Sequence, residues 1–403
     1  MAVVAALASL GVALGGCQQS GSDSLSSSNV PPPPQTFVST VTAATPLAAP
    51  LPHYFPPVPP VLPKPRCLGP VDPAIMVIPT TIAEPWIRVR LTPALAYVPK
   101  INAANYRGRI EIDRLADGKF VAINVVPIES YLAGVLSKEL YPSWSPTAYR
   151  AQAVAARTYA LYQIATTPRN RAWNVTGTVA SQMYGGKRGE STTAWNAVLA
   201  TKGLVMETTE YGRTGIFCAF YSACNGGASQ SPYDAWGDAP VQTLPEKVTG
   251  NIDSACPKFR WPPMRIGKWT ITDAVRRWGA RNGLPYLADL GLVRNVFISH
   301  YNRATGRPTE ITFTDIHGHS GTMRAEEFRL ALLTDPAPGI PKPPSSFFRI
   351  ENDGNFIVLT HGRGFGHGIG LSQWGDEALA QRGYSAAQIL NYYYPKSFIH
   401  REW

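Results

Sequence analysis

The chain has 403 residues, which is enough for two or three domains of ordinary size. Hydrophobic residues make up 44% of it and charged residues 16%, so the chain can bury a sizeable core. The formal net charge of +10 favours contact with a polyanion, such as nucleic acid, an anionic membrane or a bacterial cell wall. No run of five or more Lys and Arg residues occurs, which argues against a nucleic-acid-binding tail.

The N-terminus has the pattern of an export signal. Met1–Gly16 is an uninterrupted run of apolar and small residues, too short to cross a hydrocarbon core of ~30 Å. The small residues before Cys17 resemble a bacterial lipoprotein signal, with cleavage before Cys17 and lipidation of its thiol. An ordinary signal peptide is the alternative, and the run departs from the secretory pattern because no Lys or Arg precedes it. Both interpretations predict export; the first predicts a membrane-anchored lipoprotein facing the periplasm or the cell wall.

Residues 18–67 are expected to form a disordered tether. Ser20–Ser28 is rich in serine, and prolines follow from Pro31 to Pro65 with few charges and little periodicity. Such a segment has no core of its own and would hold a folded domain away from a membrane. The folded domain is therefore expected at residues 68–400.

The folded part begins with strand patterns followed by two helices. Residues 86–91 and 106–123 alternate in the manner of strands, with an Asp-Gly hairpin turn in the second stretch. The spacing of apolar residues predicts a helix over 128–140. Ser145 as N-cap, with a proline in the first turn, predicts a second helix that continues to about Ala165.

The remainder of the chain mixes short strands and helices. Strands are predicted near 203–207 and 215–222. The elements that follow are a helix at 272–282, strands at 292–301, 309–315 and 321–324, and a helix at 326–333. A proline-rich bridge covers 336–344, and the last helix begins with the capping pair Ser385 and Gln388. This order predicts a mixed α+β fold of helices and antiparallel strands rather than a doubly wound α/β fold.

Glu139 is the first candidate for a catalytic acid. It lies eleven positions after Ile128, which is about 20° round the helix at ~100° per residue, on the side that carries Val135 and Leu136. A carboxyl group beside apolar side chains resists ionisation, so its pKa rises, as a general acid near neutral pH requires. The alternative is a solvent-facing glutamate, since Pro142 ends the helix soon afterwards.

The second helix contains a single charged residue in an otherwise apolar stretch. Arg157 is the single charged residue between Ala151 and Ala165. Because the rest of this stretch is mostly apolar, the helix is expected to be buried on nearly every side. A buried arginine needs an anionic partner. Glu139 or a bound substrate would serve, and a purely structural ion pair is the alternative.

A glycine-rich segment lies near the C-terminus, with glycine at every second position from Gly362 to Gly370. If this segment is extended, one face carries all the side chains, and the bare face lets a ligand or another backbone come close. The Gly-Lys-Ser/Thr ending of a phosphate-binding loop is absent. The Phe, His and Ile between the glycines argue against a flexible linker.

Several blocks of sequence, in order, resemble the SpoIID/LytB family. They are YLAGVLSKEL at 131–140, Trp144 with AQAVAARTYA at 151–160, SQMYGG at 181–186, YSACNGG at 221–227, GFGHGIGLSQWG at 364–375 and ILNYYYP at 389–395. The resemblance covers roughly residues 85 to 400. It implies a SpoIID-like catalytic core at 85–250 and 345–400, with an inserted α+β subdomain at about 257–340.

The resemblance implies a peptidoglycan lytic transglycosylase that acts in cell-wall remodelling and prefers glycan strands stripped of stem peptides. The family's catalytic glutamate matches Glu139. It would protonate the glycosidic oxygen leaving N-acetylmuramic acid, and then take the proton of that sugar's own 6-hydroxyl, closing a 1,6-anhydro ring without water. Most glycosidases use two carboxyl groups, so the lack of a paired Asp/Glu motif does not argue against this activity.

Six other residues in the family's blocks are candidates to bind the glycan. They are Arg157, Gln182, Tyr184, Ser222, His367 and Gln373. Each is equally well explained as a support behind the groove. For the whole protein, the alternative is a non-catalytic module that binds glycan and enhances a cell-wall amidase. A zinc hydrolase would need a histidine–carboxylate cluster, which the sequence lacks.

Cysteines other than Cys17 are the candidates for disulfides. Cys67, Cys218, Cys224 and Cys256 are an even number in an exported protein, a pattern that suggests disulfide bonds. Some relatives bind zinc near the positions of Cys218 and Cys224 with the help of histidines, but this chain has no histidine between His53 and His300. Two cysteines alone make a poor zinc site. We therefore expect a disulfide, and no metal or other cofactor.

Overall fold

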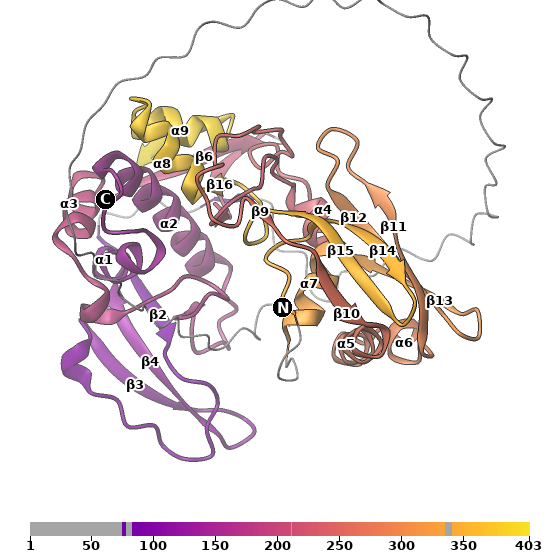
Figure 1. Cartoon of the computed structure of the whole chain (residues 1–403). Coiled ribbons are helices and arrows are strands. Elements are labelled where there is room, and N and C mark those ends of the chain that lie inside the picture. The colour runs from indigo at the N-terminus through magenta and orange to yellow at the C-terminus, as the bar shows by residue number, and fades with distance from the viewer. Residues whose placement is uncertain (1–74, 78–82, 211, 335–340) are drawn as a thin grey trace, which may run out of the picture. The chain divides into compact units, whose positions relative to one another are not determined.

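The computed structural model describes residues 75–77, 83–210, 212–334 and 341–403 of the chain (Figure 1). Cys17, Cys67 and the expected tether lie outside these residues. Within them, no helix combines the length and the apolar character that a membrane crossing requires.

The first sheet confirms the strand pattern at the start of the folded part. Its strand order is β3-β4-β2-β5, formed by Arg109–Arg114, Phe120–Pro127, Trp86–Arg90 and Val175–Thr176. The predicted hairpin turn joins β3 to β4, and Gly118 adopts a φ of +80° there, which glycine does without steric cost. Ile87, Val89 and Val126 of this sheet belong to the first hydrophobic core.

Two helices run through the first core, as predicted. α1 (Ile128–Glu139) begins directly after β4, and Leu140 is extended and ends it. α2 (Pro146–Thr166) begins after Ser145, whose hydroxyl oxygen accepts a backbone N–H of the first turn. α2 is buried along most of its length, because its many alanines let α1 and α3 (Thr192–Ala200) pack against it. The sequence patterns did not predict α3.

A second sheet and the C-terminal helices pack on α2 as well. The strand order of this sheet is β1-β7-β6-β17, formed by Ile75–Met76, Arg213–Phe217, Leu204–Glu210 and Ser397–Arg401. β8 (Tyr221–Ser222) pairs in parallel with β16 (Leu371–Ser372), directly before α8 (Gln373–Gln381). α9 (Ala386–Tyr393) has the predicted capping box at Ser385. Side chains of β6, β7, β8, β16, α8 and α9 share a hydrophobic cluster with α2.

Residues 261–359 contribute to a separate hydrophobic core. Its elements are, in order, β9 (Arg260–Trp261), β10 (Met264–Gly267), α5 (Lys268–Arg281), α6 (Pro285–Ala288), β11 (Val293–Tyr301), β12 (Pro308–Asp315), β13 (Ser320–Arg324), α7 (Ala325–Leu333), β14 (Phe347–Asp353) and β15 (Phe356–Arg363). We expected this subdomain to end near residue 340. Phe348, Ile357 and Leu359 nevertheless belong to its core, because β15 pairs with β9 and β10 as well as with β14.

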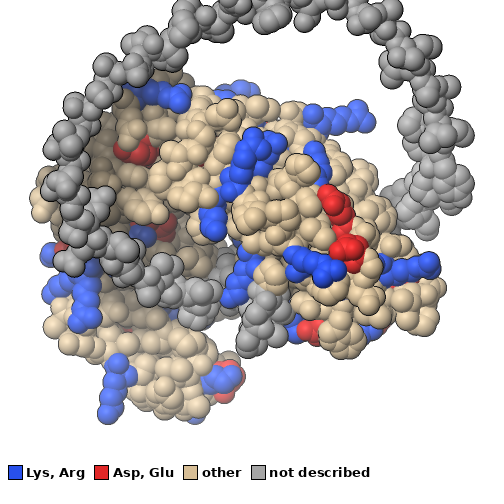
Figure 2. Space-filling view, viewed as in Figure 1, with Lys and Arg blue, Asp and Glu red and all other residues tan. Residues whose placement is uncertain are grey.

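The predicted mixed α+β class is confirmed, since helices pack on sheets whose neighbouring strands are mostly antiparallel. Three short elements remain: the 3-10 helices Ala103–Asn105 and Gly186–Gly189, and α4 (Pro232–Trp236). On the face shown in Figure 2, Lys and Arg are scattered and do not form one continuous patch. The positive charge is therefore diffuse on that face.

Candidate active site

Glu139 is the last residue of α1, and two groups from distant parts of the chain hold its carboxyl group. Oε1 accepts the backbone N–H of Met183 at 2.7 Å, and Oε2 accepts the side-chain N–H of Gln373 at 3.1 Å. Met183 lies in the loop before the 3-10 helix Gly186–Gly189, and Gln373 is the first residue of α8. Three of the sequence blocks thus meet at a single carboxyl group.

Burial raises the pKa of Glu139 above the usual value of a glutamate. The hydrogen bonds from Met183 and Gln373 favour the charged form and oppose this effect, but burial is the larger cause. The side chain still keeps part of its surface exposed, because α1 ends here. A carboxyl group that is reachable and reluctant to ionise can donate a proton near neutral pH.

Tyrosines and a glutamine form a neutral layer beneath the carboxyl group. The Tyr131 hydroxyl donates to Oε1 of Gln182 at 2.9 Å, and Nε2 of Gln182 donates to the Tyr221 hydroxyl at 2.9 Å. Burial, with a further contribution from the nearby charge of Glu139, raises the pKa of both tyrosines well above the usual value. Gln182 is fully buried. It therefore orients the two tyrosines from within the core, which is the supporting position expected as the alternative to glycan binding.

Three aromatic side chains cluster close to the chain segments that carry Glu139 and Gln373. The ring centroids of Tyr141, Trp144 and Trp374 lie 5.2 to 5.5 Å apart in all three pairs. Tyr141 follows Glu139 by two residues, and Trp374 directly follows Gln373. Trp144 is buried, whereas Tyr141 keeps 54% of its surface exposed. The site therefore has an open aromatic side in addition to its carboxyl group.

Arg157 does not pair with Glu139. It is fully buried, and its guanidinium group donates to both carboxylate oxygens of Glu129, the closest contact being 2.6 Å. A further N–H donates to the carbonyl oxygen of Leu204 at 3.0 Å. The structural ion pair that was one of the alternatives for Arg157 is thus present, with Glu129 as its anionic partner. Breaking such a buried pair costs about 3–5 kcal/mol, because one charge remains uncompensated.

The glycine-rich segment leaves the extended conformation where β15 ends. Positive φ angles occur at all four of the glycines that follow, Gly364, Gly366, Gly368 and Gly370. A Cβ atom at Gly370 would lie 2.1 Å from the carbonyl oxygen of Phe220. The bare side of the segment therefore admits the neighbouring backbone, one of the two uses expected for it.

Ser222 and His367 support this segment. Ser222 Oγ accepts the backbone N–H of Gly368 at 3.1 Å. The His367 ring packs against Phe220 and Trp236, and its Nδ1 accepts the backbone N–H of Ile369 at 3.0 Å. Burial lowers the pKa of His367 to about 4, so the ring is neutral near pH 7. These contacts are internal to the fold.

Tyr184 also belongs to the core. Its hydroxyl donates to Oδ1 of Asn124 at 2.8 Å, and its ring lies 5.1 Å from that of Tyr131. Of the six residues predicted to bind glycan, Gln373 is the one whose hydrogen bond to Glu139 is present in the described structure. The others are placed as supports of the core or of the glycine-rich segment.

The cysteines fall into two places. Cys218 lies in the first core, where Nε2 of Gln163 is 3.7 Å from its sulfur. Cys224 and Cys256 lie together in a small cluster with Phe259, and Trp374 packs against that cluster. The Cys224 thiol hydrogen-bonds to Cys256, which raises the pKa of Cys224 and lowers that of Cys256. Pairing of Cys67 falls outside the described residues.

In the part of the chain that the structure describes, neither Cys218 nor Cys224 belongs to a group of three metal-ligand side chains. Among the described residues, the group of three side chains with suitable spacing is Glu207, His400 and Glu402, at the paired strands β6 and β17 and the residue that follows. This group includes neither cysteine. The hydrogen bonds of the Glu139 carboxyl group in the described structure are with Met183 and Gln373, and none is with this group.

Two groups at the site were not predicted from the sequence. The backbone N–H of Met183 gives no sequence signal, because any residue except proline offers one. Tyr141 stands in a short turn without periodicity between two helices. Trp144 and Trp374 carried a signal, since both lie in blocks that resemble the family.

Comparisons with known proteins agree with the sequence blocks. The family model SpoIID, described as stage II sporulation protein, matches residues 116–207, the stretch that contains Glu139. An uncharacterized protein of Brachyspira hyodysenteriae is 29% identical over 294 residues, covering 73% of this chain and 72% of that protein.

Two relatives from Bacillus subtilis have named roles. The amidase enhancer is 28% identical over 290 residues, covering 66% of this chain but 39% of that protein. Stage II sporulation protein D is 24% identical over 288 residues, covering 68% of this chain and 74% of the relative. The matched segment and these relatives support the resemblance of this chain to the SpoIID/LytB family.

Proposed function

We propose that this protein is a lytic transglycosylase that cleaves peptidoglycan glycan strands, with Glu139 as its catalytic residue. The observation that carries the proposal is the state of Glu139: partly exposed, raised in pKa by burial, and held by Met183 and Gln373. The placement of Glu139 within the segment that matches the SpoIID model supports it.

The mechanism needs one carboxyl group in two successive roles. Protonated Glu139 donates its proton to the glycosidic oxygen, and the bond from that oxygen to C1 of N-acetylmuramic acid breaks. The 6-hydroxyl oxygen of the same sugar then bonds to C1, and the Glu139 carboxylate takes its proton. The product is a 1,6-anhydro end, and Glu139 is again protonated. The pKa raised by burial favours the first step, and the N–H groups of Met183 and Gln373 stabilise the carboxylate between the steps.

The same proposal includes three further points. The glycan substrate is free of stem peptides, the protein acts in cell-wall remodelling, and a cell-wall amidase is its partner. We further propose that the protein is exported and anchored through a lipid on Cys17. Fatty-acid labelling of the full chain that disappears in Cys17→Ser would support the anchor. Labelling that persists in this variant would contradict it.

A second candidate function is a non-catalytic module that enhances an amidase. The relative named amidase enhancer, 28% identical over 66% of this chain, favours it. In that case the exposed aromatic side beside Glu139 would bind glycan, and the carboxyl group would not transfer a proton.

Product analysis separates these two functions. The folded chain and its Glu139→Gln variant are incubated with peptidoglycan from which an amidase has removed the stem peptides, and the ends are identified by mass spectrometry. We expect 1,6-anhydro ends from the unmodified chain and loss of at least about 10²-fold in rate for the variant. A matched control is Glu111→Gln on β3, which should retain full activity because Glu111 pairs with Arg88 and Arg109 away from the site. Intact glycan binding without products would favour the enhancer.

A further inference from the structure

The backbone around Tyr141, Trp144 and Trp374 holds these three aromatic side chains in place. The carbonyl oxygen of Tyr141 accepts the backbone N–H of Trp144 at 3.0 Å and the hydroxyl of Tyr149 at 3.2 Å. Trp374 donates its backbone N–H to the carbonyl oxygen of Ala223 at 3.1 Å. The turn that carries Tyr141 and the start of α8 are therefore both fixed.

A second contact fixes these two segments to each other. Oε2 of Glu377, in α8, accepts the backbone N–H and the hydroxyl of Ser145 at 2.8 Å each. Ser145 is also the N-cap of α2. Because α8 is tied to the start of α2, the ring of Trp374 keeps its position beside Tyr141, and little conformational freedom remains to be lost when a ligand binds.

The burial of the three rings differs in a way that separates support from contact. Trp144 is 8% exposed. Trp374 is half-buried and packs against the first core and against the cluster of Cys224, Cys256 and Phe259. Tyr141 is 54% exposed. A single exposed aromatic side chain needs no explanation, but one that belongs to an aromatic cluster is a candidate for binding. The rings meet at 48°, 59° and 74°, so none is stacked face to face on another.

From this arrangement we propose that Tyr141 and Trp374 form a subsite that receives the apolar face of a sugar ring next to the bond that Glu139 protonates. Trp144 supports the two rings from behind. The inference rests on the proposed function, because it assigns a glycan sugar as the occupant. Sugar rings present C–H groups on one face, and rigid aromatic side chains offer them a large apolar surface with little loss of entropy.

The subsite is tested by binding in the absence of cleavage. Every variant carries Glu139→Gln, and the Kd for a peptide-free oligomer of alternating N-acetylglucosamine and N-acetylmuramic acid is measured by calorimetry. We expect Tyr141→Ala to raise the Kd about fivefold or more, and Tyr141→Phe, which keeps the ring, to stay within about twofold. Because Tyr141 is half exposed, its truncation should lower the thermal unfolding temperature only slightly, through the lost ring contacts with Trp144 and Trp374.

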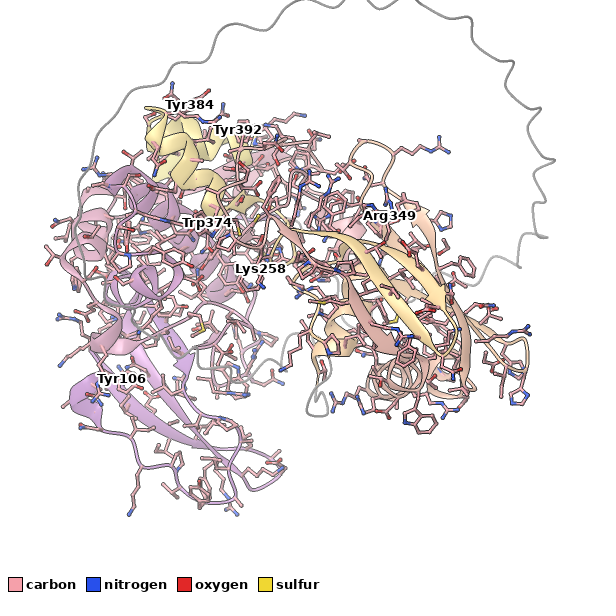
Figure 3. All side chains as sticks on the ribbon, viewed as in Figure 1. Tyr106, Lys258, Arg349, Trp374, Tyr384 and Tyr392 are labelled. Atoms are coloured by element: carbon pink, nitrogen blue, oxygen red, sulfur yellow. The ribbon has the colours of Figure 1, made fainter. Side chains whose placement is uncertain are left out.

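A matched control is Tyr384→Ala. Tyr384 is 43% exposed and lies beyond the end of α8 that is opposite to Trp374, as Figure 3 shows. Its variant should bind like the parent. An unchanged Kd for Tyr141→Ala, an equal loss for Tyr384→Ala, or no saturable binding by the parent would each overturn the subsite.

Failure of the subsite and failure of the proposed function give different results. If Tyr141→Ala weakens binding but the unmodified chain yields no 1,6-anhydro ends, the subsite stands and the lytic transglycosylase fails. If the unmodified chain yields these ends and Tyr141→Ala binds like the parent, the subsite alone fails.

Discussion

Asp376 lies in the first turn of α8, three residues after Gln373, with its carboxyl group fully buried. Within the described part of the chain, neither of its oxygens has a hydrogen-bond partner. Burial, and then repulsion from Glu377, raises the pKa of Asp376 well above the usual value of an aspartate. The start of a helix favours a negative charge, but desolvation outweighs that effect here.

The raised pKa predicts how stability depends on pH. The pKa of Asp376 is higher in the folded state than in the unfolded state. The part of the free energy of unfolding that depends on Asp376 is therefore highest below the unfolded-state pKa, and it is lost as the pH rises through the folded-state pKa. We therefore expect Asp376→Asn to stabilise the protein near pH 7 by about 1–2 kcal/mol and to have little effect at pH 4. Urea unfolding at the two pH values measures this. If Asp376→Asn is less stable than the parent at pH 7, favourable interactions offset the cost of burying the Asp376 carboxylate, and the prediction is wrong.

Cys224 and Cys256 lie in two different loops that meet in the small cluster against which Trp374 packs. Cys224 follows β8, and its backbone pairs with Phe365 of the glycine-rich segment. Cys256 lies in the loop around Asp253, whose carboxylate accepts the backbone N–H groups of Asn225 and Gly226 and the hydroxyl of Ser372. These contacts bring the loops together before any covalent bond forms.

We expect Cys224 and Cys256 to be joined by a disulfide bond in the exported protein, with a thiol–disulfide exchange protein as the oxidant. Peptide mapping without reductant should find the Cys224–Cys256 cross-link, and reduction should lower the stability by about 2–4 kcal/mol. Cys218→Ser serves as the control and should retain the cross-link. Complete alkylation of both thiols in denatured, unreduced protein would contradict the prediction.

The elements show what sequence patterns capture. α1 and α2 were predictable because their apolar spacing and the Ser145 cap are local signals. The partner of Arg157 was not, since Glu129 lies 28 residues earlier in the chain and the pairing depends on how α1 packs against α2. The glycine-rich segment illustrates the same limit: its period of two suits a strand, but its glycines adopt positive φ to fit the neighbouring backbone.

For the whole molecule, the order of the sequence blocks indicated the family, and the fold explains why they occur in distant parts of the chain. Glu139, Met183 and Gln373 meet because α1, α8 and the loop after β5 converge on one carboxyl group. The extent of the subdomain was harder to predict, because β14 and β15 follow a proline-rich bridge in sequence, and β15 pairs with β9 and β10 as well as with β14. Such long-range pairing depends on the packed core, which no local pattern reveals.

The central claim is that Glu139 cleaves glycan without water as a reactant. The direct measurement is cleavage of peptide-free strands in water enriched in heavy oxygen, followed by mass spectrometry of the new muramic acid ends. The proposed mechanism predicts ends that lack one water and carry no heavy oxygen, and their rate of formation should fall at least about 10²-fold in Glu139→Gln. Reducing ends that contain heavy oxygen would show that the protein is a hydrolase and contradict the mechanism.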